Sequence, residues 1–237
     1  MLAQVDSSIG GKTGINNKYG KNLVGSFFQP DLVVSDINLL TTLPRREIVC
    51  GYGEIFKHSL IANKKIFNYL DKNKFKVLNL QSPYIEKAIA DSCKIKKTIV
   101  QQDEKEKNLR KVLNLGHTFA HAYEAALRYS KKLNHGEAVL LGMIIACEFS
   151  VKRKLLAFNE FSLIKKHYFS LKLLMNINKV FKRNEINKII YFMKRDKKNI
   201  DEKINLILLN KIGKTTRPKE FSLKSSEIRN FLNSYFL

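Results

Sequence analysis

The 237-residue sequence has few cysteines and no apolar run long enough to cross a membrane. Its longest apolar stretch, residues 138–151, carries Glu148 and is shorter than the roughly eighteen residues that a membrane helix needs. Cys50, Cys93 and Cys147 are odd in number and lack C-x-x-C spacing. They indicate thiols in a reducing compartment, the cytoplasm, rather than disulfides or metal ligands. The first residues lack a basic region followed by an apolar core, so no secretory signal is expected.

Acidic residues are also scarce, because 21 Asp and Glu face 43 Lys and Arg, which gives a formal net charge of +22. A basic helical module that binds nucleic acid is one explanation, since lysines neutralise phosphates. However, the lysines are spread along the chain and mixed with Asn and Ile, as in "NKKIFNYLDKNKFKVLN". No helix combines clustered Lys and Arg with aromatic residues that could stack on bases. We therefore favour a solvated basic surface with no nucleic-acid partner and no membrane partner.

Residues 1–44 differ in character from the rest of the sequence. They contain "GGKTG", "VGSFFQP" and the strand-like "DLVVSDI", which are typical of loops and strands. From Pro44 onward a helical period of 3.6 dominates, and "KINLILLNKIGKTTRP" predicts two short strands around a glycine turn. We expect a mainly α, multi-helical domain over residues 45–237, a short α/β segment over 1–44, and a small β-hairpin near 204–217. The expected helices cover about 45–63, 82–102, 113–128, 136–154, 158–170 and 185–195.

Two short motifs are weak when taken alone. The stretch "GGKT" (10–13) is not a phosphate-binding Walker loop, because Asp6 stands where that pattern requires glycine. Lys12 can still contact an anion from this glycine-rich turn, and a plain surface turn fits equally well. In "GYGEIFKHSL", Glu54, Lys57 and His58 share one helical face, a spacing that is also common for surface ion pairs.

The histidines carry a stronger signal. In "GHTFAH", His117 and His121 lie four positions apart on one helical face together with Glu124, and His135 follows in "NHGEAV". Two histidines and one glutamate form a common catalytic zinc set. The metalloprotease motif H-E-x-x-H is absent because Thr118 follows His117. Spacing favours a metal over a structural histidine pair, but selects neither two of the three histidines nor the carboxylate.

Five segments in this order resemble the successive motifs of the 3-dehydroquinate synthase family: residues 3–30, 42–61, 103–125, 135–139 and 195–199. The resemblance covers nearly the whole chain. It implies an NAD- and zinc-dependent lyase, with cobalt as a possible substitute for zinc. Such a lyase converts 3-deoxy-D-arabino-heptulosonate 7-phosphate to 3-dehydroquinate and phosphate, a step of the shikimate pathway to aromatic amino acids. It also implies a homodimer.

The resemblance assigns separate roles to the two histidines of "GHTFAH". Glu54, His117 and His135 match the metal ligands, whereas His121 matches a residue that contacts the phosphate of the substrate. Other substrate-binding positions are matched by Lys12, Asn22, Lys57, Lys96, Arg110, Asn114 and Lys197. The positions near the nicotinamide cofactor are matched by Asp6, Lys12, Lys21, Leu39, Leu40, Thr41, Thr42, Leu43 and Glu47.

The sequence departs from the family in one respect. The family begins with a nucleotide-binding α/β domain whose glycine-rich loop binds the pyrophosphate of the cofactor, and no such segment precedes "AQVDSS" here. An incomplete sequence, a separate NAD-binding chain or a decayed gene would each explain this. We expect the 237-residue chain alone to have little activity. Another sugar-phosphate cyclase of the same superfamily is the alternative function.

Overall fold

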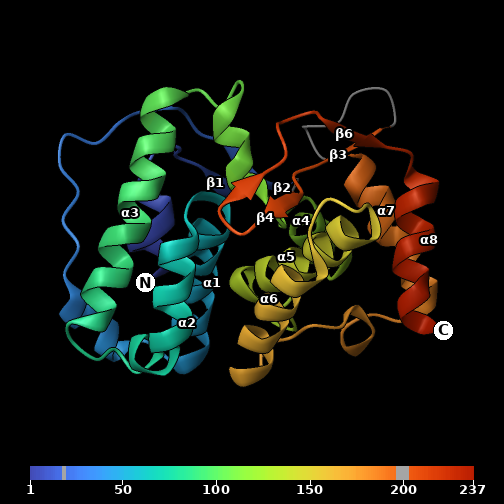
Figure 1. Cartoon of the computed structure of the whole chain (residues 1–237). Coiled ribbons are helices and arrows are strands. Elements are labelled where there is room, and N and C mark those ends of the chain that lie inside the picture. Colours follow the sequence, from blue (N-terminus) through green and yellow to red (C-terminus); the bar gives the residue numbers. More distant parts are fainter. Residues whose placement is uncertain (18–19, 196–202) are drawn as a thin grey trace.

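Helices dominate the fold, as predicted. The computed structural model describes residues 1–17, 20–195 and 203–237, without the side chains of residues 16–23. Figure 1 shows α1, α2 and α3 on one side of the molecule and α4 to α8 on the other. The α-helices are α1 (Arg45–Ala62), α2 (Lys64–Leu78), α3 (Tyr84–Gln102), α4 (His117–Ala126), α5 (His135–Lys152), α6 (Phe158–Ser170), α7 (Ile186–Lys194) and α8 (Ser225–Asn233). Short 3₁₀ segments are η2 (Ile37–Thr42), η3 (Leu109–Asn114), η4 (Ile177–Lys179), η5 (Arg183–Glu185) and η6 (Ser234–Phe236).

The core centres on α5, which packs against both α1 and α4. Thirteen of the 18 residues in α5 are buried, and the same fraction holds for α1. A helix that is apolar nearly all round belongs inside a protein. The polar groups of α1, among them Glu54 and His58, are therefore carried into the interior by an element that is itself core.

The three strand pairs are all antiparallel. They join β1 (Ile15–Asn17) to β2 (Gly20–Val24), β3 (Ile204–Leu206) to β6 (Phe221–Leu223), and β4 (Leu209–Lys211) to β5 (Lys214–Thr215). The hairpin predicted near 204–217 is confirmed as β4–β5, and Gly213 supplies the positive φ of 92° that its turn requires. In addition β3 pairs with β6, so the strand region extends to Leu223.

One prediction for residues 1–44 is wrong. The run "DLVVSDI" forms no strand: residues 32–36 have no regular secondary structure, and Ile37 already begins η2. Local β propensity needs a neighbouring strand to become a sheet, and none of the described residues pairs with this run. The side chain of Asp36 instead accepts a hydrogen bond from the backbone N–H of Asn38 at 2.9 Å and caps η2. Residues Ala3–Ser7 form a short π-helix, η1, which the sequence pattern did not indicate.

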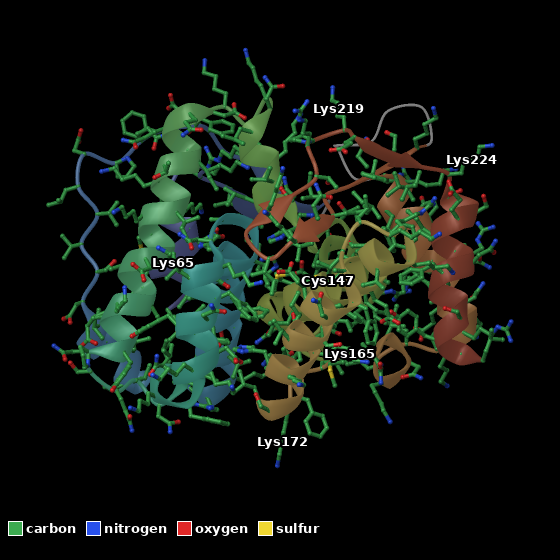
Figure 2. The ribbon with its side chains drawn as sticks, in the orientation of Figure 1. Lys65, Cys147, Lys165, Lys172, Lys219 and Lys224 are labelled. Carbon is green, nitrogen blue, oxygen red and sulfur yellow. The ribbon has the colours of Figure 1, made fainter. Side chains whose placement is uncertain are left out.

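Helices α2 and α8 were missing from the predicted set. The lysine-rich α2 has an apolar side, with Phe67, Leu70 and Val77 buried. The side chain of Asn63 caps it by accepting from the N–H of Lys65 at 2.8 Å. Lysines outside α2 also point to solvent. Figure 2 shows Lys172, Lys219 and Lys224 pointing outward at separate edges, whereas Cys147 is buried. All three cysteines are free thiols, as predicted.

Candidate metal and substrate site

Three helices bring Glu54, His117 and His135 together. Glu54 lies in the middle of α1, and the two histidines begin α4 and α5. One ligand atom from each residue lies within 4.8 Å of the others. The Glu54 side chain is fully buried and that of His117 is 10% exposed. The group is therefore enclosed on the side of α1 and reachable on the side of the histidines.

Two glycines permit this approach. A Cβ on Gly136 would lie 2.3 Å from the Cα of Cys50, so only glycine lets the start of α5 lie against α1. Gly116 precedes α4 with φ at 79°, a conformation that favours glycine. Asn134 caps α5 in a capping box with Glu137, whose carboxylate accepts from Arg46 at 2.7 and 2.6 Å. These contacts fix the turns on which His117 and His135 sit.

The hydrogen bond of His117 selects the nitrogen that it offers to a metal. Nδ1 of His117 lies 3.3 Å from the carbonyl oxygen of Leu115, which can only accept, so Nδ1 carries the proton. Its Nε2 faces Oε1 of Glu54 at 3.6 Å. That oxygen is buried and has no hydrogen-bond partner among the described residues. A buried carboxylate oxygen facing an imidazole lone pair is the donor set that a divalent cation satisfies. The residues therefore fit zinc.

His121 lies beside this group rather than in it. Its ring centre is 5.5 Å from that of His117 and 6.4 Å from that of His135. The close ligand groups found in the described part of the chain do not include it. The side chain of Glu124, on the same helical stripe, does not join the ligands either, because its Oε2 contacts Nδ1 of His135 at 3.2 Å.

A second close group consists of Asp6, Glu54 and His58. Its two carboxylates already face ammonium groups: Lys96 contacts Oδ1 of Asp6 at 2.6 Å, and Lys57 contacts Oε2 of Glu54. Glu54 belongs to both groups and keeps Oε1 toward His117, but the second group also depends on Asp6, whose charge Lys96 offsets. The first group therefore suits a metal better, and the second is a buried network of ion pairs.

Burial and charge shift the pKa values in this network. Burial lowers the pKa of Lys96, and the carboxylate of Asp6 only partly offsets this. For Asp6, burial by itself would raise the pKa, but the charges of Lys57 and Lys96 bring it below its ordinary value. Burial, followed by the charge of Lys57, places the pKa of His58 well below its ordinary value, so this imidazole is neutral. Its Nδ1 lies 2.6 Å from the hydroxyl of Ser92.

Glu106 contacts side chains that were predicted to bind the substrate. Glu106 itself was not predicted from the sequence. Its carboxylate contacts Nζ of Lys12 and accepts from the side chain of Asn114 at 2.8 Å. Arg110 is buried and donates to the carbonyl oxygens of Gly10, at 2.9 Å, and Glu104. Glu106 belongs to the motif "DEKEKNLR" that carried Arg110, but spacing along the chain gave no sign that it reaches Lys12.

The residues predicted to bind the cofactor are separate from the three metal-ligand candidates. Leu39, Leu40, Thr41, Thr42, Leu43 and Glu47 lie in η2, after it and in the first turn of α1, more than one turn before Glu54. The hydroxyls of Thr41 and Thr42 bond to the carbonyl oxygens of Asn38 and Leu39. Of the cofactor positions, Asp6 and Lys12 join the ion-pair networks. The side chains of Lys21 and Asn22, and all of Lys197, lie outside the described residues.

Comparison with known proteins extends to both ends of the chain. Residues 51–199 match the model of the 3-dehydroquinate synthase C-terminal domain, and residues 1–50 match that of the N-terminal domain. The 3-dehydroquinate synthase of Pelagibacter ubique (strain HTCC1062) is 58% identical over 95% of this chain, and that of Dictyoglomus thermophilum is 45% identical over 90%. These matches cover 61% and 59% of the relatives, so the chain spans about three fifths of their length.

Solved structures share the fold. A 2-epi-5-epi-valiolone synthase from Streptomyces hygroscopicus subsp. jinggangensis 5008, with NAD⁺ and Zn²⁺ bound, superposes with a TM-score of 0.85 at 23% identity over 99% of this chain and 64% of that one. A 2-deoxy-scyllo-inosose synthase complexed with carbaglucose-6-phosphate, NAD⁺ and Co²⁺ gives a TM-score of 0.81 at 24% identity over 98% and 64%. None of the described helices is long and apolar enough to span a membrane. On the two domain matches and the close relatives, the chain belongs to the 3-dehydroquinate synthase family.

Proposed function

We propose that this chain carries the metal- and substrate-binding part of a 3-dehydroquinate synthase. This lyase converts 3-deoxy-D-arabino-heptulosonate 7-phosphate to 3-dehydroquinate and phosphate in the shikimate pathway. The observation that carries the proposal is the buried Glu54, whose bare Oε1 faces His117 while its other oxygen is held by Lys57. The identity to the named relatives, far above that to the other cyclases, favours dehydroquinate formation over their reactions.

Glu54, His117 and His135 would hold zinc, and cobalt suits the same donors. Bound there, the metal would supply a Lewis acid for a substrate oxygen, and NAD would supply a hydride acceptor. The cofactor positions proposed for this chain are Asp6, Lys12, Lys21, Leu39, Leu40, Thr41, Thr42, Leu43 and Glu47. The free thiols fit the cytoplasm as the compartment.

The cations of the chain suit a substrate that bears a carboxylate and a phosphate. Arg110 is held in place by two backbone carbonyls, so its guanidinium is fixed before an anion arrives. Lys12 is about half exposed and can turn from Glu106 to a ligand. His121, together with Asn22, Asn114 and Lys197, completes the proposed set. His121 would contact the phosphate, while His117 and His135 would serve the metal.

Lys57 and Lys96 occupy a different position, because both are buried and each forms an ion pair with a carboxylate. Lys57 holds Oε2 of Glu54, and Oε1 of the same carboxylate faces His117. Lys96 is anchored on Asp6, and its lowered pKa makes it a better proton donor than an exposed lysine. These two side chains would position the carboxylates and supply protons next to the substrate.

We also propose that residues 1–44 belong to an NAD-binding unit, with residues 45–237 forming the zinc and substrate domain. Eight large apolar side chains in residues 15–39 are exposed: Ile15, Val24, Phe27, Phe28, Leu32, Val33, Val34 and Leu39. Such a concentration marks an interaction face. The relatives carry about two fifths of their length outside the match. That part would cover this face, fused or as a separate chain, within a homodimer.

Turnover tests the proposal. The chain is joined to the unmatched part of the Pelagibacter relative and assayed with NAD, zinc and the heptulosonate phosphate for release of phosphate and appearance of 3-dehydroquinate. We expect turnover by the fusion, and a loss on the order of a thousandfold in the chain alone, the equivalent of about 4 kcal/mol. The variant Glu54→Gln should abolish turnover, and an exposed change, Lys219→Gln, should leave it unchanged. Turnover only of a sugar phosphate without the carboxylate would contradict the assignment.

A further inference from the structure

We propose that Glu124 positions His135 for the metal by holding the proton on Nδ1, so that Nε2 presents its lone pair. The inference rests on the proposed zinc site and adds a residue that contacts no metal itself. Nothing in the spacing of the sequence indicates this role, because Glu124 and His135 lie on different helices. In the sequence pattern Glu124 was instead a candidate ligand.

The contact is close and enclosed. Oε2 of Glu124 lies 3.2 Å from Nδ1 of His135, and the Glu124 side chain is 7% exposed. An ionised carboxylate can only accept a hydrogen bond, so the pair places the proton on Nδ1 and leaves the lone pair on Nε2. The carboxylate also increases the electron density that the imidazole offers to a metal. The geometry therefore selects both the tautomer and the orientation of the ring.

The position of Glu124 favours a contact with His135 over direct ligation. It contacts His135 through one ring nitrogen, and a metal held by His135 would bind the other. Glu124 is absent from the close ligand groups of the described residues, whereas His135 is a member. Its role is therefore exerted through the imidazole of His135.

The Nδ1 atoms of His117 and His135 donate to different kinds of acceptor. His117 donates from Nδ1 to the carbonyl oxygen of Leu115, two residues earlier in the chain. His135 instead donates from Nδ1 to the side chain of Glu124 on α4. The backbone contact cannot be removed by substitution, but the side-chain contact can. The contact of His135 with Glu124 can therefore be deleted by a single substitution.

The experiment compares Glu124→Gln and Glu124→Ala with a matched control, Glu148→Gln. Glu148 lies on α5, and its carboxylate accepts from the hydroxyl of Tyr235 at 2.6 Å, so the control also removes the charge of a hydrogen-bonded glutamate. Zinc affinity of the 237-residue chain is measured by competition with a chelator. The tautomer of His135 is read in the metal-free protein from its ¹⁵N and ¹H ring shifts.

We expect Glu124→Ala to weaken zinc binding by about 10- to 100-fold, as losses of such partners do. Glu124→Gln should lose less, because the amide oxygen still accepts from Nδ1, and Glu148→Gln should bind as the parent chain does. Metal-free His135 should be protonated on Nδ1 in the parent chain and become a mixture of tautomers in Glu124→Ala. These readouts do not require turnover, so they stand even if the substrate is a different one.

Two results would overturn the proposal. One is an unchanged zinc affinity in Glu124→Ala with the parent chain binding zinc normally. The other is a proton on Nε2 of His135 in the metal-free parent chain. If the parent chain bound no zinc at all, the metal site of the proposed function would fail together with this inference.

Discussion

Helix α1 and the segment that precedes it are neighbours in the sequence, yet they bury their side chains in opposite ways. Tyr52, Phe56 and Leu60 of α1 are fully buried. In the preceding segment Leu32 is 78% exposed and Val34 80% exposed. Figure 1 draws this segment, between β2 and η2, as an extended trace at the outer edge of the molecule beyond α3.

This difference in burial determines which binding sites the isolated chain can form. On α1 even Glu54, Lys57 and His58 are inside, so their geometry is fixed by the core. A site on a rigid element holds its ligands more precisely than a site on a loop. The cofactor candidates Thr41 and Thr42 sit instead on a short 3₁₀ helix whose surroundings are open. The metal site should therefore form in the isolated chain, whereas the cofactor site needs further contacts.

The largest expected effect is on zinc affinity, which should depend on the proposed ligands and hardly at all on the open segment. His135→Ala removes a proposed ligand and should weaken zinc binding on the order of a thousandfold or more, about 4 kcal/mol. His121→Ala, next to the ligands, and Thr42→Ala, in the open segment, should each change it less than threefold, by about 0.6 kcal/mol. Zinc competition with a chelator measures all three. Equal losses in His135→Ala and His121→Ala would remove the division of roles between the histidines.

The second prediction compares stability. Ile145 on α5 is fully buried, and Ile145→Ala should cost about 2–5 kcal/mol, because it deletes packed methylene and methyl groups and leaves a cavity. Val34→Ala should stay within about 0.5 kcal/mol in the isolated chain, since Val34 is 80% exposed. Denaturant unfolding provides both values. A large loss in Val34→Ala would mean that the open segment is already packed against something in the isolated chain.

The third prediction uses pH to test the buried side of α1. Tyr52 bonds to Nε2 of His167 at 2.8 Å, and Nδ1 of His167 contacts Asp71 at 2.8 Å. Burial lowers the pKa of His167 from 6.5 to about 4, although Asp71 opposes this. Between these values the unfolded chain binds more protons than the folded chain, so acidification destabilises the fold.

From pH 7 to pH 5 this histidine should reduce the free energy of unfolding by about 2 kcal/mol. His167→Gln cannot titrate, so its stability should fall less over the same interval by about that amount. Asp71, whose pKa lies below its ordinary value, loses its contribution only at lower pH. Parallel pH profiles for His167→Gln and the parent chain would contradict the assignment.

The smallest effect concerns the turn that carries His135. The side chain of Asn134 accepts from the N–H of Glu137 at 2.9 Å and caps α5. Asn134→Ala should cost about 1 kcal/mol of stability. Asn134→Ser keeps a capping oxygen and should retain most of it. Thermal or denaturant unfolding distinguishes them, and equal losses would show that the cap has no stabilising role.

Local pattern was sufficient for much of the fold. The Pro44 boundary and the 3.6 period predicted α1, and the expected helix over 158–170 coincides with α6. The same local reasoning failed for "DLVVSDI", because a strand depends on a partner and the pattern contains no information about one. Helix α2 was not predicted because its many lysines outnumber the buried apolar residues that recur at helical spacing.

The site was less accessible to the sequence, because its contacts join distant residues. Gly136 lies against Cys50, 86 positions away, and Glu106 reaches Lys12 across 94 positions. Histidine spacing indicated a metal but left open which two histidines and which carboxylate take part. The structure brings Glu54 to His117 and places Glu124 behind His135, two contacts that depend on the packing of α1, α4 and α5.

Anomalous diffraction from a zinc-soaked crystal of the chain, collected on both sides of the zinc absorption edge, tests the account most directly. We predict one strong peak bonded to Oε1 of Glu54 and to Nε2 of His117 and of His135, at the roughly 2.0–2.2 Å usual for zinc. His121 should lie outside bonding distance. A peak among Asp6, Glu54 and His58, or one bonded to His121 in place of His135, would contradict the account.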